Sequence, residues 1–350
     1  MFKEYIYTKE TTDFTKLKVK EFNNNPIFTY EKFECEICSS KKFKTFFTND
    51  RYEINQDTGI CLNCGFFFSN PRLSNQSSKL FYNLDYYRMI YQKSKIFYDN
   101  DLFYNDTLNT VKNHKFIEPK KPNFDYYYKN LYFDFINYYI KDFKTVLDIG
   151  CGKGLKLMDF KTLGKEVYGI EPSQTYNKVH NKMGINSKVG FIDDIDAEVG
   201  YDLVLLTHVF EHLYNFKDVV KKLEKVTKKY LFIEVPGHIK KLQSIQNAHN
   251  FYFSINTLNY FLLNSKFKLI NLDYSKDNEY ILALYEKKSE KSKFSFNFHN
   301  EKKNILKIHR KYLIKYFFIK IIRWLKLEKI ARSFYKLLKM SKWDYTTVYT

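Results

Sequence analysis

Thr145-Val-Leu-Asp-Ile-Gly-Cys-Gly-Lys-Gly154 is the stretch that decides the fold of this 350-residue chain. Its first five residues predict a buried parallel strand over 145–149. Gly150, Gly152 and Gly154 follow, and their missing side chains let the backbone turn tightly and approach a ligand where a Cβ would intrude. A helix is predicted directly after the last glycine. Together these features predict the corner at which α/β proteins bind nucleotides.

The segment from Asp148 to Gly154, an acidic residue followed by alternating glycines, resembles the first motif of class I S-adenosylmethionine (AdoMet)-dependent methyltransferases. A dinucleotide fingerprint would place two residues between its second and third glycines. The resemblance implies an α/β fold with a Rossmann-like seven-stranded methyltransferase sheet, and AdoMet as cofactor. For the glycine pattern taken alone, a NAD-type or purely structural turn is the alternative.

Acidic residues at the ends of later strands extend the predicted cofactor site. A strand over 165–171 ends at Glu171, where a carboxylate can accept hydrogen bonds from both ribose hydroxyls of a nucleoside; a surface glutamate is the alternative. In the family the loop after the third strand contacts adenine, so either Asp193 or Asp194 is the candidate there. The predicted AdoMet site comprises Asp148, Gly150, Cys151, Gly152, Gly154, Glu171, Asp193, Asp194, Thr207 and His208.

The rest of segment 144–287 completes the predicted sheet. Further strands are predicted over 187–191, 201–207, 230–235, 268–274 and 279–286, with helices over 173–183, 216–227 and 256–264 between them. The polar turn at 275–278 suits an antiparallel final hairpin, which the resemblance to methyltransferases also implies.

Four of the five cysteines form two CxxC pairs, Cys35-Glu-Ile-Cys38 and Cys61-Leu-Asn-Cys64-Gly65. Two such turns can clamp one tetrahedral Zn²⁺ through four thiolates. An odd cysteine count in a chain expected in the cytosol favours a metal over disulfides. A small β unit with four reduced cysteines is the alternative. We therefore predict a zinc-ribbon-like unit over 33–75 with a structural Zn²⁺ on Cys35, Cys38, Cys61 and Cys64.

The order of CxxCG, an apolar run, Asn70-Pro-Arg72 and a Tyr-rich segment at 80–87 resembles a bacterial subgroup of class I methyltransferases with an N-terminal zinc-binding unit. The resemblance covers roughly residues 33–287. It associates the chain with sugar or surface-glycan modification. Tyr82, Tyr86 and Tyr87 are candidates for the substrate mouth, although plain packing is equally expected in so Tyr-rich a chain.

Three histidines are predicted to lie near the transferred methyl group. His208 and His212 belong to a segment that resembles the family's "hvlEHl" consensus, and His249 to one that resembles "H..hFs". A hydroxyl acceptor must lose its proton, and His249 is the predicted general base. His212 is expected mainly to hold its loop and His208 to line the cofactor pocket.

The trio His208, Glu211 and His212 also resembles the place where ubiquinone-pathway O-methyltransferases hold a divalent metal. Those enzymes have a carboxylate where this chain has His208. The substitution argues against Mg²⁺ and against metal-assisted catalysis.

Thr207-His-Val-Phe210 stands where amino-methyltransferases that act on nucleic-acid bases have Asn/Asp-Pro-Pro-aromatic. The predicted reaction is therefore O-methylation, or less favourably C-methylation, of a small molecule or sugar in surface-glycan biosynthesis. An RNA-directed methyltransferase that grips RNA with its zinc unit and basic tail is one alternative, and a non-catalytic AdoMet-fold scaffold is another. The acceptor, the methylated atom and the oligomeric state stay open.

Outside the two motif regions, the sequence predicts a loosely structured lead-in over 1–32, a connector over 76–143 with a helix at 126–143, and a polar linker over 288–303. The tail, 304–350, has basic residues between apolar ones at helical spacing. Fourteen Lys or Arg and a single acidic residue lie between 302 and 342, so this tail carries most of the chain's net charge of +19. A basic amphipathic helix that rests on an anionic membrane surface or packs on the enzyme is predicted.

No run approaches the roughly 18 apolar residues of a membrane span, and no apolar core follows Met1. We therefore expect a cytoplasmic protein, with peripheral contact at the inner membrane face through the tail. A small-molecule or sugar acceptor is the expected partner, and nucleic acid is the less favoured one.

Overall fold

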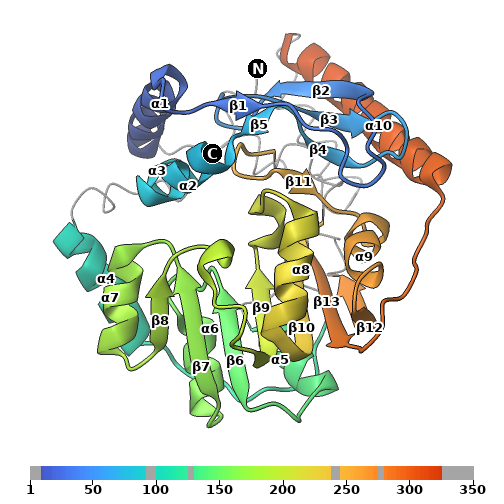
Figure 1. Cartoon of the computed structure of the whole chain (residues 1–350). Coiled ribbons are helices and arrows are strands. Elements are labelled where there is room, and N and C mark those ends of the chain that lie inside the picture. The colour runs from blue at the N-terminus through green and yellow to red at the C-terminus, as the bar shows by residue number, and fades with distance from the viewer. Residues whose placement is uncertain (1–8, 92–99, 125–129, 238–244, 275–279, 325–350) are drawn as a thin grey trace, which may run out of the picture.

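The computed structural model describes residues 9–91, 100–124, 130–237, 245–274 and 280–324. A large sheet with helices on both faces forms one part of the molecule, and a smaller N-terminal unit lies over one end of it (Figure 1). The C-terminal helix crosses the far side of that unit.

The large sheet has seven strands in the order β12-β13-β10-β9-β6-β7-β8. The five neighbouring strands β10, β9, β6, β7 and β8 run parallel to one another. Strand β13 runs antiparallel to both of its neighbours, β10 and β12. The predicted Rossmann-like sheet with an antiparallel final hairpin is therefore confirmed. The strands are β6 (Thr145–Ile149), β7 (Glu166–Glu171), β8 (Asn186–Val189), β9 (Tyr201–Thr207), β10 (Thr227–Pro236), β12 (Phe267–Tyr274) and β13 (Tyr280–Lys287).

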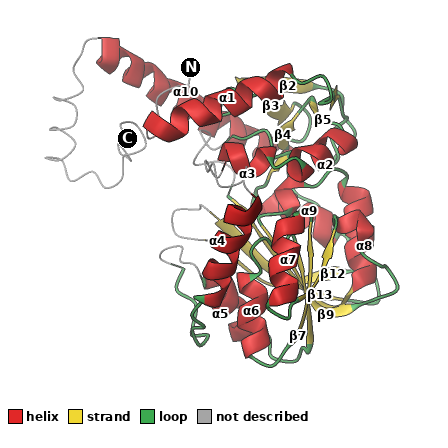
Figure 2. Cartoon of the chain, turned by 90° about the vertical axis from the view of Figure 1, so that its left-hand side faces the viewer, coloured by secondary structure: helices red, strands yellow, loops and turns green. Residues whose placement is uncertain are grey.

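The central strands are buried on both faces, as expected for a parallel sheet covered by helices. Successive apolar residues alternate between the two faces: Leu203 packs with α5 and α6, and Val204 packs with α8 and α9. The helices of this domain are α5 (Leu131–Tyr139), α6 (Leu155–Thr162), α7 (Gln174–Lys182), α8 (Phe216–Val226) and α9 (Ile255–Leu263). Figure 2 shows helices on both sides of the sheet.

The N-terminal unit is built on an antiparallel sheet that uses a strand from far along the chain. Its order is β11-β4-β3-β2, with β2 (Phe43–Asn49), β3 (Asn55–Cys61), β4 (Phe67–Ser69) and β11 (Phe251–Tyr252). A two-residue pair, β1 (Tyr30–Glu31) with β5 (Arg72–Leu73), leads to α2 (Asn75–Asn83) and α3 (Tyr86–Tyr91). Because β11 follows β10, the unit predicted over 33–75 is completed by the larger domain.

The expectation of a loosely structured lead-in is wrong for residues 9–24. They form α1 (Lys9–Asn24), which contacts α3. Phe14, Val19 and Phe22 are buried in one cluster with Phe81 and Met89. Their spacing is helical, which supplies the apolar stripe that a surface helix needs to pack.

The connector contains α4 (Asn100–Lys112) and then α5, which begins at Leu131. The first residues of the helix predicted at 126–143, up to 129, lie outside the described residues. The described residues between α4 and α5 pack on the domain: Phe116 and Phe124 contact the rings of Phe133 and Phe135, and Asp134 accepts a hydrogen bond from Lys120 N.

The final helix, α10 (Phe298–Trp324), begins inside the segment predicted as a linker over 288–303. Asn297 explains the early start, because its side chain accepts a hydrogen bond from Asn300 N at 3.0 Å. Ile305 is buried against the N-terminal unit, and the His309 ring stacks on Phe46 with centroids 3.7 Å apart. The first part of the predicted tail helix therefore packs on the protein, while its residues 325–350 lie outside the described residues.

None of the helices in the described part of the chain is long and apolar enough to cross a membrane.

Candidate functional site

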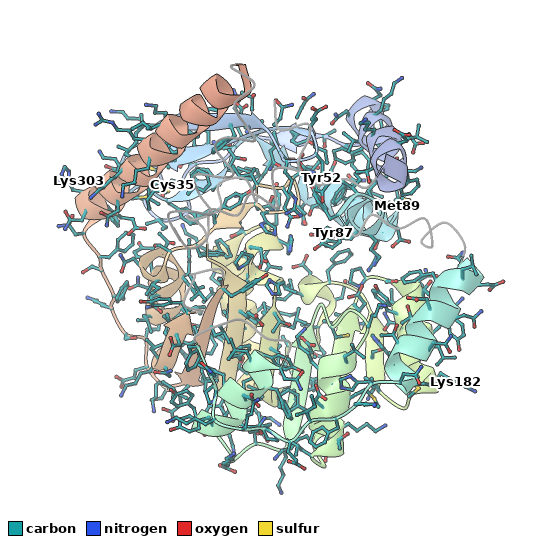
Figure 3. All side chains as sticks on the ribbon, turned by 180° about the vertical axis from the view of Figure 1, so that it is seen from behind. Cys35, Tyr52, Tyr87, Met89, Lys182 and Lys303 are labelled. Atoms are coloured by element: carbon teal, nitrogen blue, oxygen red, sulfur yellow. The ribbon has the colours of Figure 1, made fainter. Side chains whose placement is uncertain are left out.

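A cavity of about 740 Å³ lies at the carboxyl ends of β6, β7 and β9, where parallel sheets place their ligands. Its lining comes from the glycine turn, the ends of the strands, the start of α8 and the helices α2 and α3 of the N-terminal unit. Figure 3 shows Tyr87 of α3 between that unit and the sheet. The cavity is therefore shared by both parts of the molecule.

The glycine turn has the backbone geometry that its sequence predicts. Gly150 has φ +71°, and a Cβ built there would lie 2.5 Å from the Val209 side chain. Gly152 has φ +53°, but a Cβ there would meet nothing within 4 Å. Both glycines line the cavity. Gly152 therefore leaves open space for a ligand, and its backbone has a conformation that residues with a side chain rarely adopt.

Glu171 ends β7 beside this turn, as predicted, and is buried. Its Oε2 accepts a hydrogen bond from Gly152 N and its Oε1 one from Ser173 N, both at 3.0 Å. Burial raises the pKa of this carboxyl, and Arg88 opposes that rise. Arg88, on α3, donates to Glu171 Oε1 at 2.7 Å. The predicted diol-binding carboxylate thus has an arginine partner from the N-terminal unit.

Several predicted cofactor residues support the turn from behind and do not line the cavity. Asp148 is fully buried, neither of its carboxylate oxygens has a hydrogen-bond partner among the described residues, and burial raises its pKa to about 6. The Cys151 side chain packs in the core on the α5 and α6 face, so its predicted cofactor contact is not made by the thiol. Gly154 packs against His180, and the buried Thr207 hydroxyl has no hydrogen-bond partner in the part of the chain that the structure describes.

The two candidate adenine contacts point in different directions. Asp193 lines the cavity and pairs with Lys79 of α2 at 2.8 Å. Asp194 turns back and accepts a hydrogen bond from Phe191 N at 2.8 Å. The geometry therefore favours Asp193 as the residue available to a ligand.

His208 follows β9 and is one of the few residues other than glycine with a positive φ, 55°. Such backbone strain persists where the surrounding structure holds it, often at functional sites. His208 Nδ1 lies 3.7 Å from Glu211 Oε1 and Nε2 lies 3.6 Å from Glu234 Oε1. Burial lowers the pKa of His208, but the two carboxylates outweigh burial and raise it to about 10. His208 is thus an imidazolium at neutral pH.

His212 lines the same cavity with a different protonation state. Its Nδ1 lies 2.7 Å from Ala248 O, a contact that requires Nδ1 to carry the proton. Burial lowers the pKa of His212. The lowered pKa favours the neutral ring, although Glu211 and backbone hydrogen bonds to Ala248 and His208 oppose the shift, and Nε2 lies 3.8 Å from Glu211 Oε1.

His249, the predicted base, lies behind His212 with ring centroids 4.7 Å apart, and is not among the residues that line the cavity. Its Nε2 lies 3.8 Å from Glu211 Oε1 and contacts the amide of Gln246. Burial, followed by the neighbouring His212, lowers its pKa well below the ordinary value. The three predicted histidines therefore do come together, around the carboxylate of Glu211.

Two of the three predicted substrate-mouth tyrosines line the cavity. Tyr82 and Tyr87 present ring edges to His212, at centroid distances of 6.0 and 5.7 Å. Tyr86 instead packs in the core of the N-terminal unit with Phe22 and Phe28.

The four CxxC cysteines converge in the N-terminal unit. The Sγ atoms of Cys35 and Cys64, and of Cys38 and Cys61, are 3.5 Å apart, and all four lie within 4.8 Å of one another. Zn–S bonds of about 2.3 Å in a tetrahedron place sulfur atoms roughly 3.8 Å apart. The arrangement fits a structural zinc ion.

A second group with metal-ligand chemistry is Glu211, His212 and His249, whose ligand atoms also lie within 4.8 Å of one another. It differs from the trio predicted from sequence, because His249 replaces His208. The His208 imidazolium and the Gln246 amide already supply a positive charge and a donor to this cluster.

Sequence reasoning missed Arg88, Lys79, Glu234 and Gln246. Arg88 and Lys79 lie on helices of the N-terminal unit, and no motif signals that they reach across to β7 and the Asp193 loop. Glu234 is next to Val235 in the fifth predicted strand, and its place at the carboxyl end of that strand is the signal that could have found it.

A family model described as a methyltransferase domain matches residues 124–272. The ubiquinone biosynthesis O-methyltransferase of Bradyrhizobium diazoefficiens is 33% identical over 89 residues, 24% of this chain and 35% of that protein. Its counterpart in Rhodopseudomonas palustris is 38% identical over 74 residues, which are 19% of this chain and 29% of that protein. The chain thus spans about a third of the length of the curated relatives it matches.

Among solved structures, a putative AdoMet-dependent methyltransferase from Listeria monocytogenes is similar with a TM-score of 0.37 and 18% identity, covering 44% of this chain and 96% of that one. The 1,6-didemethyltoxoflavin-N1-methyltransferase of Burkholderia thailandensis has a TM-score of 0.42 and 11% identity, covering 71% of this chain and all of that one.

Proposed function

We propose that this protein is an AdoMet-dependent methyltransferase that transfers the methyl group to an oxygen of a small molecule. One observation carries the proposal: a single cavity is lined on one side by Gly152 and Glu171 and on the other by His208 and His212, whose ring nitrogens lie 3.7 and 3.8 Å from the Glu211 carboxylate. The first side has the features of a nucleoside site and the second has those of an acid–base centre. The family match over residues 124–272 supports the same reaction class.

The cofactor pocket is proposed to use Gly150 and Gly152 as the backbone cradle, Glu171 for the ribose hydroxyls and Asp193 for the adenine amine. Asp148 lies beneath the cradle and does not line the cavity, so it is proposed to support the glycine turn from behind. When bound, AdoMet supplies an already activated methyl group on a sulfonium. The protein therefore has to align the acceptor and accept its proton.

His212 is the group that the geometry favours for accepting that proton. Its Nε2 carries a lone pair and the ring lines the cavity, and its Nδ1–H is fixed on Ala248 O. After protonation, the imidazolium would be stabilised by Glu211, 3.8 Å away. His249 is 3.8 Å from the same carboxylate and is the next candidate, which a small shift of the His212 ring would bring to the cavity.

The acceptor is proposed to be a hydroxyl of a small molecule or sugar, as in a precursor of a surface glycan. The support is the resemblance of this chain, with its two CxxC pairs, to glycan-modifying methyltransferases, together with O-methyltransferases among its partial relatives. Tyr82 and Tyr87 would provide the apolar and hydroxyl-bearing wall on which such an acceptor packs.

A cell extract incubated with the protein and AdoMet that carries a deuterated methyl group would test this function. Mass spectrometry should find the label in a small molecule or sugar and not in RNA. A labelled RNA would replace the proposal with the RNA-directed alternative. Treatment with a chelator that leaves the cysteine zinc in place should not reduce the transfer; if it did, Glu211, His212 and His249 would hold a catalytic metal.

A structural Zn²⁺ on the four CxxC cysteines and peripheral membrane contact through the basic tail complete the proposal. The cysteine geometry supports the zinc. The charge of residues 302–342 supports contact with anionic lipid, and the packing of α10 on the N-terminal unit would hold the enzyme at that surface.

A further inference from the structure

Glu36 lies inside the first CxxC turn, between Cys35 and Cys38, and its side chain extends from the N-terminal unit to the large domain. Its Oε2 accepts a hydrogen bond from Phe216 N at 2.8 Å. Phe216 is the first residue of α8, whose free N–H groups favour a negative charge. One residue of the cysteine turn therefore caps the helix that follows the His212 loop (residues 208–214).

Arg72 connects the same carboxylate to the His212 loop. Its Nη2 donates to Glu36 Oε1 at 2.6 Å and to the carbonyl oxygen of Tyr214 at 2.8 Å. The side chain is 1% exposed, and its guanidinium lies over the rings of Phe33 at 4.0 Å and Phe251 at 4.4 Å. Arg72 thus touches the cysteine turn, the His212 loop and β11 at once.

The N-terminal unit also holds the second histidine loop, residues 245–250. Ser69 of β4 donates its hydroxyl to the carbonyl oxygen of His249 at 3.0 Å, and its N–H to that of Asn250 at 2.9 Å. The Asn250 side chain in turn donates to His212 O at 2.9 Å. The two loops are therefore fastened to each other and to the N-terminal unit.

We propose that Glu36 and Arg72 are positioning residues through which the four-cysteine unit fixes the His212 loop in its reactive geometry. The inference rests on the proposed function, in which His212 accepts the acceptor's proton. Neither residue lines the cavity. They act through the backbone of Tyr214, the last residue of the loop, and of Phe216, which follows it.

The orientation of His212 shows why such fixing matters. Its reactive tautomer depends on one hydrogen bond, from Nδ1 to Ala248 O, between the two loops. A displacement of either loop by about 1 Å would lengthen that bond and free the ring, and errors of this size strongly reduce catalysis. The cysteine unit, cross-linked by the proposed zinc ion, would supply the rigid support.

Glu36→Gln tests the proposal, with Glu34→Gln as its matched control. Glu34 stands on the other side of Cys35, is 52% exposed at its side chain and pairs only with Lys41 among the described ion pairs. Hydrogen exchange of the full, zinc-loaded chain should become about tenfold faster in residues 208–216 and 245–252 of Glu36→Gln, the effect of losing one charged hydrogen bond. Exchange in β6 and β9 should stay unchanged, as should every segment of Glu34→Gln.

Nitrogen NMR of the His212 ring measures which ring nitrogen carries the proton, a property that a general loss of stability would not change. In the wild type, Nδ1 should carry the proton; in Glu36→Gln, the ring should become a mixture of both tautomers. His212→Gln identifies the resonance. Arg72→Lys, which keeps the charge but loses the planar fork, should give the same mixture.

If both variants keep the melting temperature and zinc content of the wild type, and both leave the loops' exchange and the His212 tautomer unchanged, the proposal is wrong. An equal response of Glu34→Gln would also overturn it. These measurements need neither AdoMet nor an acceptor, so they separate this inference from the proposed function. If the wild-type protein did not bind AdoMet in calorimetry, the proposed function alone would be refuted.

Discussion

Arg88 Nη2 lies 2.7 Å from Glu171 Oε1, so an arginine of the N-terminal unit holds the carboxylate that we assign to the ribose of AdoMet. That carboxylate already accepts bonds from Arg88, Gly152 N and Ser173 N. A carboxylate offers about four acceptor positions, and two ribose hydroxyls need two of them. Cofactor binding must therefore displace or share one existing bond. The Arg88 bond is the one that a movement of α3 can release.

Glu171→Ala should weaken AdoMet binding by about 2–3 kcal/mol, because two charge-assisted hydrogen bonds are lost. Calorimetry with the zinc-loaded protein measures the change. Glu166→Ala, at the exposed start of the same strand, is the control and should bind like the wild type. Equal affinities of Glu171→Ala and wild type would exclude the ribose assignment.

Asp148→Asn should change how stability depends on pH. Burial raises the folded-state pKa of Asp148 from 3.8 to about 6, so the folded protein holds this proton more tightly than the unfolded chain does. The contribution of Asp148 to stability is therefore present below about pH 4 and is lost as pH rises to about 6. Relative to wild type, the variant's free energy of unfolding should rise by about 3 kcal/mol between these pH values and then stay level.

Urea unfolding at a series of pH values, without AdoMet, measures this difference. A constant difference from pH 4 to 7 would mean that Asp148 titrates normally, and that its buried oxygens have donors in solution.

Cys61→Ser should lose the predicted zinc and destabilise the N-terminal unit, because its small core depends on the metal cross-link. Elemental analysis should give one zinc per chain for the wild type. Cys151→Ala should retain that zinc, since Cys151 lies in the core of the large domain. Zinc well below one per chain in the wild type would contradict the four-thiolate site.

His212→Gln should leave AdoMet affinity unchanged and lower kcat on the identified acceptor by roughly 10²–10⁴-fold, the usual cost of removing a general base. His299→Gln, an exposed histidine of α10, is the control. Near-normal turnover of His212→Gln combined with a large loss in His249→Gln would move the role to His249. Normal turnover in both would mean that alignment alone drives the transfer.

Removal of residues 325–350 should reduce co-sedimentation with anionic vesicles, because six Lys or Arg lie there. This truncation keeps Ile305 and His309, which pack on the N-terminal unit. Binding that stays unchanged, or that persists with neutral vesicles, would remove the membrane proposal.

The sequence was sufficient to predict the seven-stranded sheet with its antiparallel final hairpin and the convergence of the four cysteines. These features are encoded by short motifs: the glycine corner, the acidic strand ends and the CxxC turns can each be recognised from a few consecutive residues. Asp148, Gly150, Gly152 and Glu171 follow from these motifs, and the structure places all four around one turn.

The partners of these residues could not be predicted, because they depend on how the N-terminal unit docks. Arg88 has no motif, yet it pairs with Glu171 across 83 positions of sequence. His249 was predicted to face the methyl group from its position after the fifth strand. The pairing of β11 with β4 instead draws its loop toward the N-terminal unit and sets its ring behind His212. Both differences arise from contacts between segments that are distant in the chain.

The pairing of β4 with β11 has a consequence for the order in which the protein can form. Phe68 pairs with Phe251, roughly 180 residues later in the chain. During synthesis the edge of β4 therefore stays exposed until most of the larger domain has left the ribosome. Such distant pairing slows folding, and an exposed edge invites association with other chains. We expect the nascent protein to depend on chaperones, or on early metal uptake by the cysteines, until β11 has been synthesised and can pair with β4.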